Sequence, residues 1–163
     1  VEGRLVKVVR MGIRATVSRT LDDEEIILPN SVLVQNSVTN FTLKDRLYRL
    51  RATVGVVYWS DMAKVREALE KVAGDIAWRV QSMDPRIQLR QFGNSSVDFE
   101  VSVWIDEPWR CQQRLSELNE AIWFALKEAE ITIAFPQIDV HFDGAVNQSF
   151  EELRSFVSSQ KSS

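Results

Sequence analysis

Alternation of apolar and polar side chains predicts several strands in this chain. The period is clearest in residues 97–105, where every second residue is apolar, and residues 48–58 repeat it. Successive side chains of a strand point to opposite faces, so this period indicates one buried and one exposed face. A shorter strand is predicted over residues 87–92, joined to the strand at 97–105 by a turn at residues 93–96.

Two segments have the period of amphipathic helices. The first follows Ser60 and Asp61, which are suitable N-cap residues, and is broken by Asp84-Pro85. Its apolar positions are Met62, Val65, Leu69, Val72, Ile76 and Val80. The second opens at Pro108, a residue common in the first turn of a helix. Its apolar positions are Leu115, Leu118, Ile122, Ala125, Leu126 and Ala129.

A last strand over residues 138–142 completes the order β-α-β-β-α-β, which is ferredoxin-like. Both helices would cover one face of a four-stranded sheet. We therefore expect an α/β-domain over residues 48–142. Residues 143–163 are polar and predict a tail with a short helix and then a disordered end.

The first part of the chain is rich in Val, Ile, Thr and Arg and predicts a small all-β domain over residues 1–47. The acidic residues 22–25 separate two apolar stretches, so we expect them at the exposed turn of a hairpin. Pro29-Asn30-Ser31 stops the second strand, and residues 32–42 contain further β-forming residues up to about Asn40. The predicted fold class is therefore α+β.

Composition is that of a globular protein: 163 residues, 45% hydrophobic and 26% charged, with a net charge of −3. The apolar runs are only a few residues long, whereas a membrane span needs about 20. The single cysteine excludes an internal disulfide and fits a reducing compartment. The N-terminus does not resemble a signal peptide. Because the chain begins with Val1, we expect a fragment of a longer protein.

No constellation of side chains indicates an enzyme, a metal site or a cofactor. His141, the sole histidine, has no partner residues at zinc-ligand spacing, and Cys111 has no separate histidine as base. Residues 22–25 lack the alternating pattern of a calcium loop. The glycines are too far apart for a phosphate-binding motif. We expect no catalytic, cofactor-binding or metal-binding residues.

Basic and aromatic residues leave a binding role open. A basic run in the β-domain fits a solvated or intersubunit face about as well as an RNA surface; it consists of Arg4, Lys7, Arg10, Arg14 and Arg19. The signature of RNA-binding strands is missing, and the predicted α/β-domain is acidic, so nucleic acid is not expected. Trp104 and Trp123 fall outside the predicted core positions, which favours a subunit interface.

Several motifs resemble those of the small-conductance mechanosensitive channel (MscS) family. They are Gly12-Ile13-Arg14-Ala15-Thr16, Arg19-Thr20-Leu21-Asp22, Ile26-Ile27-Leu28-Pro29-Asn30-Ser31 with Asn40, Val54-Gly55-Val56-Val57-Tyr58-Trp59-Ser60-Asp61, Phe92-Gly93-Asn94-Ser95-Ser96-Val97 and Ile131-Thr132-Ile133-Ala134-Phe135-Pro136-Gln137. The resemblance covers residues 3–142. Asp23 and Glu130 stand where the family has glycine, and Ala134 stands where it has proline.

The resemblance implies an LSm-like β-domain truncated at its N-terminus, followed by the ferredoxin-like domain. In a homoheptamer the β-domains form a ring and the α/β-domains a cytoplasmic cage, through which ions and small osmolytes reach the pore on hypo-osmotic shock. Membrane helices upstream would anchor the parent protein in the inner membrane, and this region alone would not conduct. Pro29, Asn30, Ser31 and Asn40 would shape the β-ring. The alternative is a free-standing RNA- or ligand-binding module.

Overall fold

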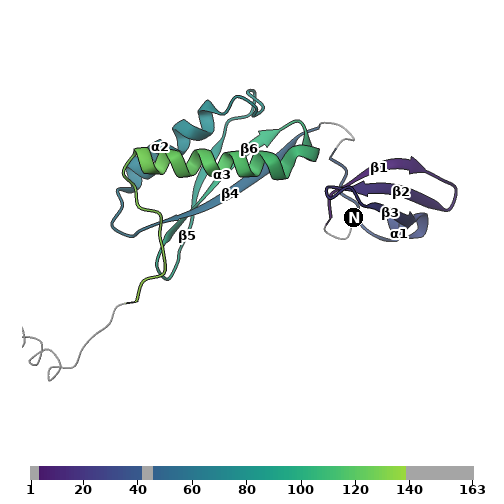
Figure 1. Ribbon diagram of the computed structural model, residues 1–163, viewed down its shortest axis with the longest axis horizontal. Coiled ribbons are helices and arrows are strands. Elements are labelled where there is room, and N and C mark those ends of the chain that lie inside the picture. The colour runs from purple at the N-terminus through teal and green to yellow at the C-terminus, as the bar shows by residue number, and fades with distance from the viewer. Residues whose placement is uncertain (1–3, 42–45, 139–163) are drawn as a thin grey trace, which may run out of the picture.

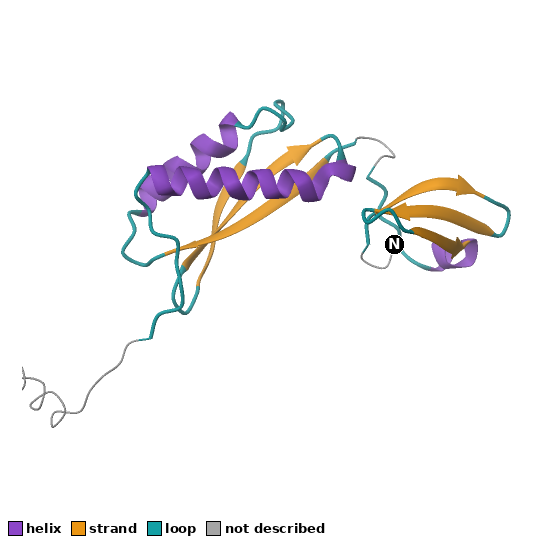
Figure 2. Ribbon diagram, viewed as in Figure 1, coloured by secondary structure: helices purple, strands orange, loops and turns teal. Residues whose placement is uncertain are grey.

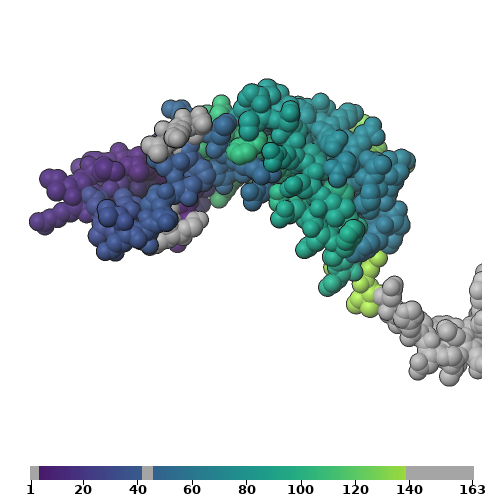
Figure 3. Space-filling model, turned by 180° about the vertical axis from the view of Figure 1, so that it is seen from behind, coloured from purple at the N-terminus to yellow at the C-terminus, as the bar shows by residue number. Residues whose placement is uncertain are grey.

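The computed structural model describes residues 4–41 and 46–138 (Figure 1). They form two separate three-stranded sheets, of which the C-terminal one is covered by two long helices (Figure 2). All the described strands pair antiparallel. The predicted α+β class is confirmed, and the two parts lie side by side along the long axis of the molecule (Figure 3).

The N-terminal sheet consists of β1 (Val6–Met11), β2 (Ala15–Thr20) and β3 (Glu25–Pro29), in the order β1-β2-β3. Its two connections are hairpins, as β2 pairs antiparallel with both neighbours. The acidic turn between β2 and β3 is exposed, as predicted. Asp23 in this turn has a φ of 63°. That left-handed conformation is one that Asp adopts more readily than most residues, so the turn forms without glycine.

A short helix, α1 (Asn30–Gln35), follows β3 directly. The prediction of further β structure after residue 31 is therefore wrong for this segment. The backbone N–H of Asn30 donates a hydrogen bond to the carbonyl oxygen of Arg14 at 2.9 Å. This bond extends the pairing of β2 with β3 by one residue beyond Ala15 and Pro29, and the chain then enters α1. The β propensity of the valines that follow is a weak preference, which the fold overrides here.

The C-terminal sheet has the order β4-β6-β5. Its elements in chain order are β4 (Tyr48–Val56), α2 (Met62–Asp75), β5 (Arg86–Phe92), β6 (Val97–Ile105), a turn of 3-10 helix η1 (Pro108–Arg110) and α3 (Cys111–Glu128). This confirms the predicted order of strand, helix, two strands and helix. The central β6 is the strand with the clearest alternation in the sequence.

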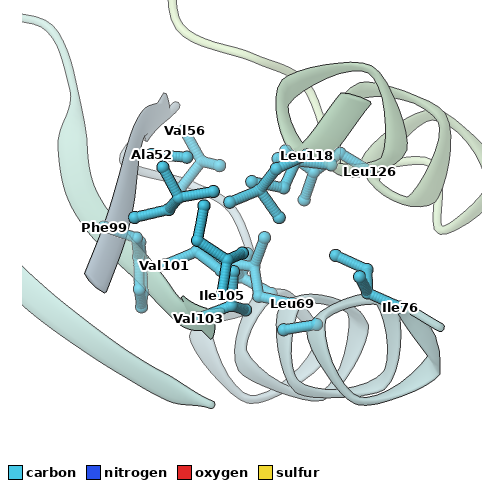
Figure 4. Close-up of a cluster of buried hydrophobic side chains, with 14 of the residues drawn as sticks. Ala52, Val56, Leu69, Ile76, Phe99, Val101, Val103, Ile105, Leu118 and Leu126 are labelled. Atoms are coloured by element: carbon cyan, nitrogen blue, oxygen red, sulfur yellow. The ribbon is translucent and has the colours of Figure 1, made fainter. Parts of the chain in front are cut away.

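The hydrophobic core lies between this sheet and the two helices (Figure 4). The apolar side chains on the helix-covered face of β6 are at most 2% exposed; they are Val97, Phe99, Val101, Val103 and Ile105. Leu69 of α2 and Leu118 of α3 are fully buried against them. Burial of one such side chain contributes about 1.5–3 kcal/mol, so this core is the main source of stability.

Asp61 caps α2 as predicted, because its Oδ1 accepts hydrogen bonds from the backbone N–H groups of Ala63 (2.9 Å) and Lys64 (3.3 Å). The helix ends at Asp75, however, and does not reach Val80 as the apolar spacing predicted. The backbone N–H of Val80 instead donates to the carbonyl oxygen of Trp104 at 2.8 Å, so this segment is tied to the end of β6.

The end of α3 is a Schellman motif. The N–H of Ile131 donates to the carbonyl oxygen of Leu126 (2.9 Å), and the N–H of Glu130 donates to that of Lys127 (3.1 Å). Glu130 has a φ of 58°, so a residue with a side chain occupies a left-handed position that favours glycine. Beyond it, Ile133 forms a single antiparallel bridge with Val56.

The predicted fourth strand cannot be compared in full. Ile138 is described and is not in a strand, whereas residues 139–142 and the tail at 143–163 lie outside the described residues. His141 falls in the same segment.

Candidate functional site: Asn30 and the exposed apolar residues of the N-terminal sheet

The motif residues predicted to shape the β-domain lie where β3 passes into α1. Pro29 is the last residue of β3 and precedes the first turn of α1, and Asn30 begins that helix. Ser31 and Asn40 are exposed. Of these four residues, Asn30 has the most informative contacts.

The side chain of Asn30 holds the turn between β1 and β2. Its Nδ2 donates to the carbonyl oxygens of Gly12 (3.0 Å) and Ile13 (3.1 Å), and its Oδ1 accepts from the hydroxyl of Thr16 (2.8 Å). Thr16 is fully buried, so its hydroxyl needs this partner. One amide side chain therefore satisfies three groups that are 14 to 18 residues away in sequence.

Gly12 completes this arrangement by its lack of a side chain. A Cβ atom at Gly12 would lie 2.9 Å from the carbonyl oxygen of Ala15, closer than carbon and oxygen can approach without a shift. The N–H of Gly12 also donates to that carbonyl oxygen at 2.9 Å. Two motifs that are separate in the sequence, around Gly12 and around Asn30, are thus one hydrogen-bonded unit in the structure.

The N-terminal sheet has almost no apolar core of its own. Among residues 4–41, Leu28 is the only buried hydrophobic residue, at 9% exposure. The other buried side chains are polar: Thr16, Ser18 and Thr20. The Oγ of Ser18 has no hydrogen-bond partner in the described part of the chain. A three-stranded sheet with so little apolar burial is marginal by itself.

Large apolar side chains of this sheet, of its β1–β2 turn and of α1 face solvent instead. They are Val8 (54% exposed), Val9 (54%), Met11 (70%), Ile13 (99%), Ile27 (70%) and Val34 (85%), hereafter the exposed apolar set. Single exposed hydrophobic residues are ordinary, but a concentration of them on one small sheet marks an interaction surface. The N-terminal sheet therefore has the composition of one side of an interface.

A cavity of about 1200 Å³ is lined by residues of the N-terminal sheet region and of the C-terminal part. Its lining includes acidic residues of the N-terminal hairpin, Asp22 and Glu24, and basic residues of β4, Arg49 and Arg51. Cys111 also borders it, and burial raises the pKa of its thiol, which makes it a poor nucleophile. No group of three or more His, Cys, Asp or Glu side chains among the described residues is placed to hold a metal ion.

The basic residues of the first strands are partly neutralised by acidic neighbours. Arg19 pairs with Asp23 at 3.6 Å and with Glu25 at 3.4 Å across the β2–β3 hairpin. Trp104 and Trp123, which the sequence placed outside the core, lie outside the core cluster; Arg49 covers the ring of Trp104 and Lys127 covers that of Trp123.

Two family profiles match the chain along most of its length. One, the mechanosensitive ion channel beta-domain, matches residues 3–43, and the other, mechanosensitive ion channel MscS, C-terminal, matches residues 50–133. The second match alone covers more than half of the chain. The chain belongs to the mechanosensitive ion channel MscS family. This is a family of channels and not a class of enzymes.

Individual relatives agree with this assignment. The mechanosensitive channel MscK of Escherichia coli is 32% identical over 145 residues, which are 89% of this chain and 13% of MscK. An MscS family protein of Haemophilus influenzae is 32% identical over 146 residues, 90% of this chain and 13% of that protein. The chain thus spans only a small part of these relatives.

A solved structure shows the same fold. The closed-state crystal structure of Helicobacter pylori MscS matches with a TM-score of 0.77 and 27% identity, over 87% of this chain and 56% of that chain. Arabidopsis thaliana MSL1, at 10% identity and a TM-score of 0.61, supports the fold alone. Within the described residues, every helix is too short or too polar to cross a membrane.

Proposed function

We propose that this chain is the cytoplasmic cage portion of a mechanosensitive channel that releases ions and small osmolytes on hypo-osmotic shock. In this proposal residues 1–47 join a ring of β-domains, residues 48–142 form the wall of a homoheptameric cage, and residues 143–163 are a tail. The parent protein lies in the inner membrane, with this region on the cytoplasmic side. The region itself neither conducts nor senses tension.

The exposed apolar set is the observation that carries the assembly part of the proposal. Removing its side chains from water against a second copy would supply the apolar burial that the N-terminal sheet lacks, at about 25 cal/mol per Å². The Asn30 unit fixes the turn that carries Ile13, the most exposed member of the set. Pro29, Asn30, Ser31 and Asn40 thus act in shaping the surface, with no chemical role.

The experiment is light scattering of the 163-residue chain over a concentration series. The expected result is a mass that rises to that of a heptamer. The double variant Ile13→Ser, Ile27→Ser should shift assembly to at least tenfold higher concentration, since two large apolar side chains leave the interface. Phe92→Ser is the matched control, because Phe92 is as exposed as Ile27 (71% and 70%) but lies on the other sheet.

A chain that stays monomeric at every concentration, or a double variant that assembles like the control, would contradict an interface formed by the N-terminal sheet. Osmotic downshock survival of cells that depend on the parent protein tests the channel function separately. Ile13→Ser, Ile27→Ser in the parent protein should then reduce survival, whereas Phe92→Ser should not.

A further inference from the structure

The face of the C-terminal sheet that carries no helix displays four arginines, Arg49 and Arg51 on β4 and Arg86 and Arg90 on β5, hereafter the basic sheet face. The strand register places Arg51 and Arg86 on either side of Ser102 in the central strand β6. With strands about 4.8 Å apart, their Cα atoms are roughly 10 Å from each other. At this spacing the side chains of Arg51 and Arg86 are long enough to meet above Ser102, which is small.

Ser102 and Arg49 form an ordered floor for this point. Ser102 is 2% exposed, and its hydroxyl accepts a hydrogen bond from an Nη atom of Arg49 at 2.7 Å and donates to the carbonyl oxygen of Arg86 at 3.3 Å. The guanidinium of Arg49 also lies over the ring of Trp104, 5.9 Å from its centroid. Its Nε is buried and has no hydrogen-bond partner in the described part of the chain.

The remaining three guanidinium groups are poorly matched by acidic partners. One carboxylate, that of Glu100, serves both Arg51 (4.0 Å) and Arg90 (3.8 Å), and both distances exceed that of a hydrogen bond. Within residues 4–41 and 46–138, Arg86 makes no side-chain ion pair. The side chains of Arg51 and Arg90 are 60% and 57% exposed. Most of their N–H donors therefore face solvent.

The second acidic group on this face is already bound elsewhere. Asp98 accepts hydrogen bonds from the side chains of Ser96 (2.6 Å) and Gln91 (2.9 Å), and these bonds lower its pKa. It lies at the start of β6, opposite Gly55, whereas Ser102 and Trp104 lie near the strand's end. On the sheet face itself, four arginines thus share one available carboxylate, that of Glu100. The further acidic groups nearby, Asp22 and Glu24, border the cavity beside Arg49 and Arg51.

We propose that the basic sheet face binds a small polyvalent anion of the phosphate type above Ser102 and Arg49, held by Arg51 and Arg86 with Arg90 at its side. Guanidinium groups donate paired N–H bonds that match the oxygens of a phosphate, which spherical anions such as chloride do not match. The site is independent of channel function and of assembly. In the cytoplasmic cage of the proposed function, on which this last step rests, it would make the cage region responsive to the phosphorylated solutes of the cytoplasm.

The test is a titration of the ¹⁵N-labelled 163-residue chain with inorganic pyrophosphate at constant ionic strength, followed by NMR. The expected result is saturable shifts at the amides of Arg51, Arg86 and Ser102. Arg51→Gln, Arg86→Gln should weaken binding at least tenfold, because each lost charged bond is worth about that factor. Glu100→Gln should tighten binding severalfold, because it removes the competing carboxylate and keeps the side-chain shape.

Arg110→Gln is the matched control, because Arg110 is similarly exposed (54%) but precedes α3 and pairs with Glu107 at 3.2 Å. Arg110→Gln should change the dissociation constant for pyrophosphate by less than twofold. Shifts that do not saturate, or that the control variant changes as much as the double variant, would overturn the site. Single-stranded RNA that binds through the same arginines at least a hundredfold tighter than pyrophosphate would assign the face to a nucleic acid instead.

Discussion

At the scale of single residues, Asn30 shows how one side chain joins distant parts of the sequence. Its amide satisfies the carbonyl oxygens of Gly12 and Ile13 and the hydroxyl of Thr16. Asn30→Ala should lower the free energy of unfolding of the N-terminal sheet by about 1–3 kcal/mol, because a buried hydroxyl and two carbonyl groups lose their partner. A urea titration that follows the NMR signals of β2 measures this loss.

Asn36→Ala is the control for this prediction. Asn36 directly follows α1, and its exposed side chain donates one hydrogen bond, to the carbonyl oxygen of Val32 in that helix (2.8 Å). Its loss should cost no more than about 0.5 kcal/mol, as for most surface substitutions. Equal losses in the two variants would show that Asn30 has no special role.

Glu130 is a residue whose backbone conformation does not suit its side chain. With a φ of 58°, it occupies the position after α3 where glycine is unstrained. Glu130→Gly should therefore raise the free energy of unfolding by about 1 kcal/mol, measured by tryptophan fluorescence in urea. Glu128→Gly, at the last residue of α3, should lower the free energy of unfolding by up to about 1 kcal/mol. Destabilisation by both changes would rule out strain at Glu130.

At the scale of elements, the two ends of α2 provide a matched pair of aspartates. Asp61 caps the N-terminus through two backbone N–H groups, whereas Asp75 is the last helical residue. Asp61→Ala should destabilise the protein by about 1 kcal/mol. Asp75→Ala should leave stability unchanged or raise it slightly, because a negative charge is unfavourable at a helix C-terminus. Thermal unfolding followed by circular dichroism compares the two variants. Similar losses of stability in both would contradict the capping role of Asp61.

At the scale of the whole molecule, apolar burial is distributed unequally between the two sheets. The core cluster consists of side chains from the C-terminal sheet and its helices, and the N-terminal sheet adds Leu5 and Leu21 only at its border. All five tryptophans lie between Trp59 and Trp123 and report on the C-terminal part alone.

In the unassembled chain, urea should therefore unfold the N-terminal sheet at a lower concentration than the C-terminal part, because the N-terminal sheet buries little apolar surface. NMR signals of β2 should disappear at lower urea than the change in tryptophan fluorescence. Coincident transitions would show one cooperative unit instead.

Much of this fold could be predicted from local pattern. The bounds of β6 and the start of β4, the cap at Asp61 and the exposed acidic turn at Asp23 follow from period 2, from side-chain hydrogen bonding and from backbone preference. The end of α2 was missed because Ile76 and Val80 continue the helical spacing of apolar residues although the helix stops at Asp75. The spacing of apolar residues is the same whether a residue packs on the core from a helix or from the loop that follows it, so spacing alone does not locate the end of the helix.

The candidate site was predictable only in part. Family resemblance pointed to Asn30 among four residues, but its three partners lie 14 to 18 residues away and meet it only in the folded chain. The sequence pattern also predicted strand in place of helix α1, because its valines favour strands locally and β propensity depends strongly on tertiary context.

The sequence by itself determined the number and order of the strands and long helices within residues 48–128, since the periods of buried side chains are local properties of the chain. It also determined family membership, through ordered motifs. Tertiary structure alone decided which motifs touch, where α2 ends, which apolar residues of the N-terminal sheet stay exposed and which arginines share the helix-free face. These features depend on strand register and on contacts between distant residues, which only the folded chain creates.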